Sequence, residues 1–193
     1  MLTSFVAEEI KPVIKLLQIT DSHLFKDEKS ALLGVNTHAS FAQVLAEINA
    51  ESFDFDFVLA TGDLVQDNSD EGYHRFFDMI KTLNKNVFWI PGNHDFQPKM
   101  FDILAHDPVL SVKHLLLGAH WQILLLDSQV FGVPHGRLSQ YQLDWLQAKL
   151  KDNPNRYALV VLHHHLLPTN CAWLDQHNLR NGQDLYEILA PFP

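Results

Sequence analysis

The stretch FDFVLATGD, residues 55–63, shows a pattern that recurs along this chain: an apolar run, then polar residues. The run 55–60 is typical of a β-strand, and Asp63 stands in the loop after it. Three further strings have the same form: DSH at 21–23 after the run 13–19, GNHD at 92–95 after 87–90, and HHH at 163–165 after 158–162. Strand ends are rigid places from which to hold functional side chains. The sequence therefore predicts one site built from four strand ends.

Segments with helical spacing of apolar residues lie between these strands. Helices are predicted at 37–50, 71–83, 139–150, where Ser139 is the expected N-cap, and 181–189, and two more strands are predicted at 113–117 and 121–126. The apolar runs are continuous rather than alternating, which favours strands buried on both faces. The order β-α-β-α-β-α-β-β-α-β-α predicts a layered α/β domain.

Composition limits the classes of function. The chain has 193 residues, enough for a single domain over 1–193, and a net charge of −9, which argues against a nucleic-acid partner. Cys171 is the one cysteine, so no internal disulfide is expected and a cytoplasmic location is favoured. The N-terminal segment 1–11 contains Glu8 and Glu9 and does not read as a signal peptide. No apolar run approaches the roughly 18–20 residues of a membrane span, so no membrane partner is expected.

The first two strings contain carboxylates and an imidazole. Asp21 and His23 stand at i and i+2, and on an extended segment both side chains would point to the same side and grip one metal ion. Gly62 would let the backbone approach an ion closely, and the two oxygens of Asp63 could bridge two ions. Asp67, four residues on, is interpreted as a turn or capping residue.

The third string adds a neutral ligand and a second imidazole. Asn93 offers an amide oxygen to a metal, whereas His94 would point away from it, towards a substrate oxygen. Asp95 could orient the His94 ring by accepting its other N–H. Carboxylates, imidazoles and one amide suit Mn²⁺, Fe or Zn²⁺ better than Ca²⁺, which prefers oxygen ligands alone.

The fourth string supplies at least one further imidazole. His163 emerges directly at the strand end and is the favoured ligand. His164 faces the other way, which favours a solvated or outer-shell role. The choice between His163 and His164 stays open.

Taken together, these strings resemble the calcineurin-like metallophosphoesterases, whose pattern is D-x-H, G-D-x-x-x-D, G-N-H-D/E, H-H-x-P and G-H-x-H. The resemblance extends over nearly the whole chain from about Ile14. Longer strings resemble the bacterial 3′,5′-cyclic AMP phosphodiesterases of this family: LGVNT at 33–37, NHDFQP at 93–98, LDSQVFGVPHG at 126–136 and WLDQH at 173–177. The implied fold is a layered β-sandwich of mixed sheets flanked by helices.

The resemblance implies a two-metal phosphodiesterase that hydrolyses cyclic AMP to 5′-AMP through a metal-bridging hydroxide. Asp21, His23 and Asp63 would hold one divalent ion, and Asp63, Asn93 and His163 the other, with iron or manganese preferred over zinc or magnesium. His94 and Asp63 would be catalytic, and His23, Asp63, Asn93 and His94 would contact the substrate. The partner is then a small cyclic nucleotide, and a homodimer is left open.

The chain departs from the family pattern in two places. His165 and Leu166 stand where the fourth motif often has proline, and no final G-H-x-H occurs before Pro193. We therefore expect a chain truncated at its C-terminus that binds metals weakly and hydrolyses cyclic AMP poorly by itself. The alternatives are a metallophosphoesterase acting on another phosphodiester or a phosphomonoester, and an inactive metal-binding domain.

Overall fold

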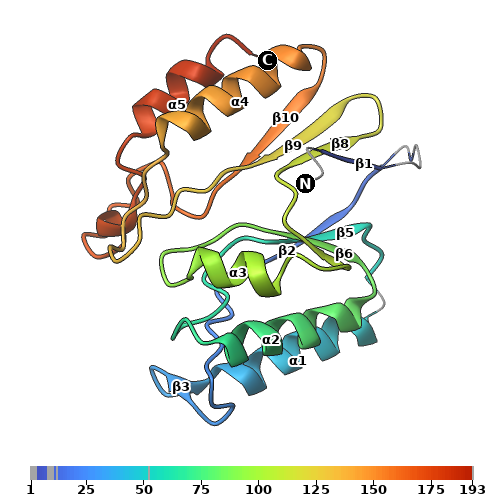
Figure 1. The fold of residues 1–193 in the computed structure, drawn as a ribbon, viewed down its shortest axis with the longest axis vertical. Helices are drawn as coiled ribbons and strands as arrows, with labels where there is room; N and C mark the ends of the chain where they lie inside the picture. The colour runs from blue at the N-terminus through green and yellow to red at the C-terminus, as the bar shows by residue number, and fades with distance from the viewer. Residues whose placement is uncertain (1–3, 8–10, 12, 52, 193) are drawn as a thin grey trace. The chain divides into compact units, whose positions relative to one another are not determined.

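The computed structural model describes residues 4–7, 11, 13–51 and 53–192, and Glu8, Glu9 and Pro193 lie outside them. The chain divides into two compact units (Figure 1). One comprises residues 13–111, and the other comprises residues 112–193 together with the N-terminal residues 1–12. They are called here the 13–111 unit and the 112–193 unit.

The 13–111 unit contains a parallel sheet in the order β2-β5-β6-β7. Its strands are β2 (Leu16–Ile19), β5 (Phe57–Ala60), β6 (Asn86–Trp89) and β7 (Val109–Leu110), and β3 (Ala31–Leu32) and β4 (Val35–Asn36) form a separate antiparallel pair. Its helices are α1 (Thr37–Ala50), α2 (Asp70–Ile80), the 3₁₀ turn η1 (Lys81–Leu83) and α3 (Gln97–Ile103). Helices α1 and α2 lie side by side along one face of this sheet (Figure 1).

The 112–193 unit contains a mixed sheet in the order β1-β8-β9-β10, in which only β8 and β9 are antiparallel. Its strands are β1 (Phe5–Val6), β8 (His114–Leu117), β9 (Trp121–Leu125) and β10 (Tyr157–Val161). Its helices are α4 (Gln140–Asp152), the 3₁₀ turn η2 (Leu174–His177) and α5 (Gly182–Leu189). Helices α4 and α5 pack against each other (Figure 1).

The predicted helices and strands are all present and follow one another in the predicted order, and α3 fills the helix position before the strand pair. The predicted helix 71–83 is a regular helix up to Ile80 and a 3₁₀ turn after it. Ser139 caps α4 as expected, because its side chain accepts a hydrogen bond from the Gln142 N–H. The sequence missed β1, β3, β4 and β7, which have two residues each and are too short to show a period.

Burial on both faces holds for the central strands but not for the edge strands. All four residues of β5 are buried, as are three of the four in β6. In contrast, Leu16 in β2 and Tyr157 and Leu159 in β10 are 40%, 56% and 37% exposed. β2 and β10 are edge strands of their sheets in the described part of the chain. For these two strands the prediction was wrong, because an apolar run does not reveal whether its strand is central.

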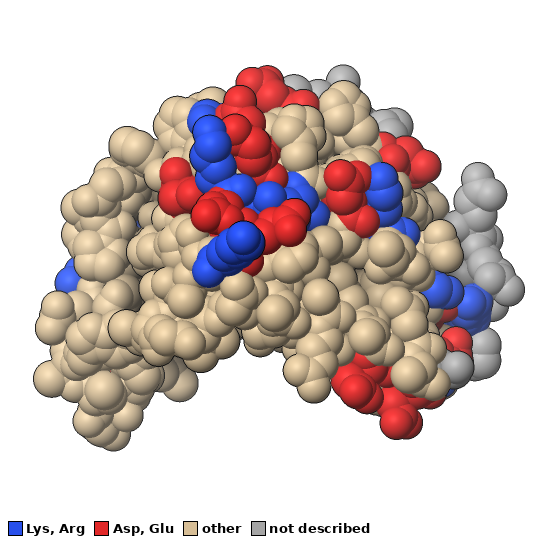
Figure 2. All heavy atoms as spheres, turned by 90° about the horizontal axis from the view of Figure 1, so that it is seen from below, with Lys and Arg blue, Asp and Glu red and all other residues tan. Residues whose placement is uncertain are grey.

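Charged residues are mixed on the surface. In the 13–111 unit, Lys26 pairs with Glu71 at 2.8 Å and Lys99 pairs with Asp70 at 2.6 Å. Figure 2 shows blue and red side chains interspersed on the face drawn, with no extended area of basic residues alone. None of the helices in the described part of the chain has the length and apolarity that crossing a membrane requires.

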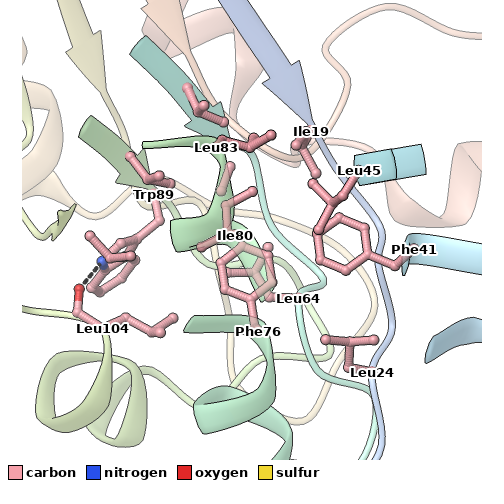
Figure 3. Packing of buried hydrophobic residues seen from close by; sticks show 14 of the residues in the cluster. Ile19, Leu24, Phe41, Leu45, Leu64, Phe76, Ile80, Leu83, Trp89 and Leu104 are labelled. Atoms are coloured by element: carbon pink, nitrogen blue, oxygen red, sulfur yellow. Dashed lines mark hydrogen bonds between the residues drawn. The ribbon is translucent and has the colours of Figure 1, made fainter. Parts of the chain in front are cut away.

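Each unit has its own hydrophobic core. In the 13–111 unit, Phe41 from α1 and Phe76 from α2 stack with ring centroids 5.8 Å apart (Figure 3). Trp89 is fully buried, and its indole N–H donates to the Leu104 carbonyl at 2.6 Å (Figure 3). This packing fixes the ends of β5 and β6, from which the polar loops emerge.

Candidate metal centre

Three of the four polar strings meet at one edge of the parallel sheet. Ile19 pairs with Ala60, and Ala60 pairs with Trp89, so β2, β5 and β6 end level with one another. The chain continues from these ends into the strings at 21–23, 62–63 and 92–95. Parallel strands place their carboxyl ends on the same edge, where open α/β sheets bind ligands.

Asp21, His23 and Asp63 form a cluster that could hold a metal ion. One ligand atom from each residue lies within 4.8 Å of the others. The His23 Nε2 atom is 3.5 Å from Asp21 Oδ1 and 3.8 Å from Asp63 Oδ2. Burial lowers the pKa of His23, but the Asp21 and Asp63 carboxylates outweigh that effect and raise the pKa overall. Two carboxylates facing one imidazole nitrogen thus form a site that favours positive charge.

The backbone brings these ligands together in a way that the sequence did not indicate. The segment 21–23 is not extended, because φ is +57° at Asp21 and +42° at His23. Asp63 is also left-handed, with φ of +52°. Such backbone costs about 1–3 kcal/mol per non-glycine residue and is concentrated at functional sites. The side chains of Asp21 and His23 converge because the backbone curls at these residues. The prediction that they lie close together was correct, but the reason given for it, an extended segment, was wrong.

Hydrogen bonds hold these curled segments against each other. The Asp21 N–H donates to the Gly62 carbonyl and the His23 N–H to the Asp63 carbonyl, both at 3.0 Å. The loop after β2 therefore runs alongside the loop after β5.

The GNHD turn packs directly against Asp63. An added Cβ at Gly92 would stand 2.1 Å from Asp63 Oδ1 and 2.4 Å from the Asp63 nitrogen. The His94 backbone N–H donates to Asp63 Oδ1 at 2.8 Å. Asn93 lies between these two contact residues, in the turn that follows β6. The close approach explains why glycine, with no side chain, stands at position 92.

The His94 imidazole has a different partner from the one expected. Its Nδ1 atom lies 3.1 Å from the Nε2 atom of Gln66, and its ring contacts the His23 ring edge-on at 5.3 Å. The expectation that Asp95 orients His94 is thus replaced by a contact from Gln66.

Asp95 instead joins the loops to each other. Its side chain is buried and accepts hydrogen bonds from the N–H groups of Leu64, Val65 and Gly92 and from the Tyr73 hydroxyl. Burial raises the pKa of Asp95 to about 6, although these backbone donors oppose the rise. Burial also raises the pKa of Tyr73. Tyr73 was not identified from the sequence, where it is one aromatic residue among those of a helix.

Asp67 has the structural role that was expected. Its carboxylate accepts from the Lys26 N–H at 2.9 Å and from the Ser69 hydroxyl at 2.6 Å. Burial would raise the pKa of Asp67, but these hydrogen bonds outweigh it and lower the pKa. Ser69 is in turn the N-cap of α2.

The histidine triplet follows β10 in the 112–193 unit. His164 is buried; its Nδ1 atom lies 2.8 Å from the Ser128 hydroxyl, and an added Cβ at Gly136 would stand 2.4 Å from its ring. His165 faces Asp175 at 3.6 Å. His163 contacts the His164 ring edge-on at 5.1 Å and is less buried than His164. His164 is thus the more buried of the two, and the choice of His163 as the metal ligand stays a prediction.

Comparisons with known proteins agree with this geometry. A family model described as calcineurin-like phosphoesterase matches residues 14–189. The chain is 70% identical over 192 residues to the 3′,5′-cyclic adenosine monophosphate phosphodiesterase CpdA of Haemophilus influenzae, covering all of this chain and 70% of that protein. It is 52% identical to the Escherichia coli K12 protein of the same name, covering 93% of this chain and 66% of that protein.

The fold has a counterpart among solved structures. A dimetal phosphatase from Danio rerio superimposes with a TM-score of 0.70 at 14% identity, covering 94% of this chain and 79% of the other. At that identity the likeness concerns the fold alone.

Proposed function

Because the chain belongs to the calcineurin-like phosphoesterase family, we propose that it is part of a metal-dependent phosphodiesterase that hydrolyses 3′,5′-cyclic AMP to 5′-AMP. The single observation that carries the metal chemistry is the convergence of Asp21, His23 and Asp63 within 4.8 Å. The choice of substrate is supported by the two bacterial relatives described above, which are both named cyclic AMP phosphodiesterases and match 93–100% of this chain. The chain spans 66–70% of the length of those two relatives.

The proposed ligands divide between two divalent ions. Asp21, His23 and Asp63 would hold one ion, and Asp63, Asn93 and His163 the other. The nearly buried Asp63, with a side chain 5% exposed, is suited to share its two oxygens because little water competes for them. Mixed oxygen and nitrogen donors favour iron or manganese in this proposal.

When bound, two such ions would neutralise the phosphate oxygens and lower the pKa of the attacking water. The protein's own contribution is to hold the reacting groups in place. Hydrogen bonding from the loops keeps Asp63 and His94 together, since the His94 N–H donates to the Asp63 carboxylate. The His94 imidazole would then donate a proton or a hydrogen bond to the departing 3′ oxygen.

A substrate panel tests the proposed reaction. The full-length gene product, supplied with Mn²⁺ or Fe²⁺, is given cyclic AMP, a generic aryl phosphodiester and an aryl phosphomonoester. We expect turnover of cyclic AMP to 5′-AMP with the highest kcat/KM of the three. Preference for the monoester would overturn the substrate proposal, and two bound ions without any turnover would favour a metal-binding protein.

Asp63→Ala tests the shared ligand. We expect it to abolish activity and to lower metal content at both sites, because both ions lose a carboxylate oxygen. Asp67→Asn is the matched control, since Asp67 belongs to the same string but bonds Lys26 and Ser69, and its metal content should not change. Two ions still bound to Asp63→Ala at wild-type affinity would exclude the bridging role.

The cellular location and the oligomeric state of the protein are part of the same proposal. A cytoplasmic location is supported by the single cysteine, Cys171, which is exposed and free. Whether the protein forms a homodimer is decided by sedimentation of the full-length gene product.

A further inference from the structure

The segment 166–178, which follows the histidine triplet in the 112–193 unit, presents an exposed indole. Trp173 is 66% exposed and immediately precedes the 3₁₀ turn η2. Its ring lies against the His177 imidazole, with centroids 4.8 Å apart and planes tilted by 54°. The Trp173 carbonyl lies 3.1 Å from His177 Nδ1. The indole is thus supported from within its own segment while much of its surface faces solvent.

The backbone around Trp173 is ordered by its own hydrogen bonds. Asp175 Oδ1 accepts from the Thr169 N–H at 2.7 Å and from the Thr169 hydroxyl at 2.8 Å. The Asp175 N–H donates to the Cys171 carbonyl at 2.9 Å. These bonds close the chain between Thr169 and Asp175 into a compact loop that contains Trp173. Because this loop is already ordered, little entropy is lost when a ligand contacts the indole.

The same segment is attached to the histidine triplet at two points. The His165 Nε2 atom is 3.6 Å from Asp175 Oδ1. The Leu179 N–H donates to the His165 carbonyl at 2.9 Å. His163, the proposed metal ligand, stands two residues before His165. Trp173 is therefore held on a loop that is fixed to the residues following the proposed ligand.

The proposed substrate has a part that such an indole would bind. In cyclic AMP one ribose joins the phosphate to a flat purine base, so a surface that binds the base must lie near the groups that hold the phosphate. Purines stack on indole rings because both have broad π-faces. The base is uncharged, so the net charge of −9 does not oppose its approach.

We propose that Trp173 binds the base of the substrate by stacking, and thereby favours a purine nucleotide over other phosphodiesters. This inference rests on the proposed function, because it takes the phosphate to be bound by the ion that His163 holds. The stacking contact does not involve the reacting bond, so it is made equally in the ground state and in the transition state. Loss of such a contact raises KM and leaves kcat unchanged.

Kinetics with and without the base test this role. The full-length gene product and its Trp173→Ala variant are given cyclic AMP and ribose 3′,5′-cyclic phosphate, which has the same reacting bond but no base. We expect Trp173→Ala to raise KM for cyclic AMP about 5–100-fold, the scale of one base–aromatic stacking contact, with kcat changed less than KM. KM for the base-free compound should not change. A KM for cyclic AMP that rises no more than that of the base-free compound would overturn the proposal.

A binding measurement separates this inference from the proposed reaction. Stacking of adenine on an indole quenches the fluorescence of that indole. We expect 5′-AMP, but not ribose 5-phosphate, to quench the tryptophan fluorescence of the Mn²⁺-loaded wild type, and Trp173→Phe to remove this quenching. Quenching without hydrolysis of cyclic AMP would support the base site while the proposed reaction fails. Absence of quenching in the wild type, or quenching that persists in Trp173→Phe, would overturn the base site even if cyclic AMP is hydrolysed.

Trp121 provides the matched control. It is also an exposed indole against a neighbouring ring, since it is 50% exposed and its ring centroid is 5.3 Å from that of Tyr157. It pairs with Tyr157 at the start of β10, whereas the histidine triplet follows the other end of β10. Trp121→Ala should therefore leave KM for cyclic AMP unchanged, and Trp121→Phe should keep the quenching by 5′-AMP.

Two results with these variants would contradict a specific base contact. If Trp121→Ala raised KM for cyclic AMP as much as Trp173→Ala, the effect would be a general one of losing a surface indole. If sedimentation showed that Trp173→Ala converts a dimer into a monomer, the indole would be a contact between two copies of the chain. Either result would overturn the proposal.

Discussion

Gly92 shows how the site depends on the absence of a side chain. Its α-carbon faces the Asp63 carboxylate so closely that even a methyl group would overlap both Asp63 Oδ1 and the Asp63 nitrogen. Because the Asp63 nitrogen is a backbone atom and cannot swing aside as a side chain could, the loop itself would have to move. The position of Asp63 is therefore determined partly by Gly92, in the loop that follows the neighbouring strand β6.

Gly92→Ala should displace Asp63 and lower kcat/KM about 100-fold or more, since a misplacement of 1 Å can cost that much. The enzyme should still fold, because Gly92 lies in a loop. Steady-state kinetics and metal content measure the effect. Gly182→Ala is the control, as its added Cβ would meet only Leu166 Cγ at 4.0 Å and should leave kcat/KM unchanged. Wild-type kinetics in Gly92→Ala would contradict the close approach.

The histidine triplet gives a second prediction for individual residues. His163→Ala should remove the second metal ion while the protein stays folded. His164→Ala should keep both ions but lower the unfolding free energy, because it empties a buried space against Ser128 and Gly136. Metal analysis and denaturant unfolding of both variants check this pair. Loss of metal from His164→Ala alone would assign the ligand to His164 instead.

Among the elements, α2 begins where the Asp63 loop ends. Ser69 caps this helix by accepting from the Gly72 N–H at 3.2 Å, and its hydroxyl donates to Asp67. One serine thus links the helix start to the loop that includes Gln66 and Asp67. The first turn also contains Asp70 and Glu71, whose negative charges interact favourably with the positive end of the helix dipole.

Ser69→Ala should lower the unfolding free energy by about 1 kcal/mol, the typical value of an N-cap. Urea unfolding monitored by circular dichroism measures it. Ser40→Ala, on an exposed position inside α1, is the control and should be neutral or slightly stabilising because alanine is the better helix former. An equal loss in both variants would show that the Ser69 cap contributes nothing specific.

For the molecule as a whole, the surface ion pairs are expected to contribute little, since exposed pairs are worth about 0–1 kcal/mol each. A half-buried cation matters more. Burial lowers the pKa of Lys113 from 10.5 to about 7, and Asp127 offsets only part of this change. Lys113 thus binds its proton more weakly in the folded chain than in the unfolded chain, so folding stability should rise with pH between about 7 and 10.5.

Lys113→Met should remove that dependence. At pH 7 the free energy of unfolding of the variant should equal or exceed that of the wild type. As the pH rises to 9, the free energy of unfolding of the wild type should increase relative to that of the variant. Each unit of pKa difference corresponds to about 1.4 kcal/mol. Urea unfolding at the two pH values measures the change. A stability difference that does not vary with pH would contradict the lowered pKa.

Much of the fold and of the candidate site was predictable because the signals are local. Apolar runs, helical spacing and the Ser139 cap gave the order of elements, and the strings at their ends identified Asp21, His23 and Asp63 as neighbours. The edges of the sheets were not predictable, since an edge strand such as β10 contains the same residue types as a central strand.

Residue types and their spacing along the chain were enough to indicate which groups could bind metal, because ligand chemistry belongs to each side chain. Tertiary structure alone decided how they are held. The left-handed backbone at Asp21, His23 and Asp63, the contact of Gln66 with His94 across 28 residues and that of Tyr73 with Asp95 across 22 have no local signal. They arise because parallel strands of one sheet place distant loops at the same edge, where buried polar atoms must find partners in each other.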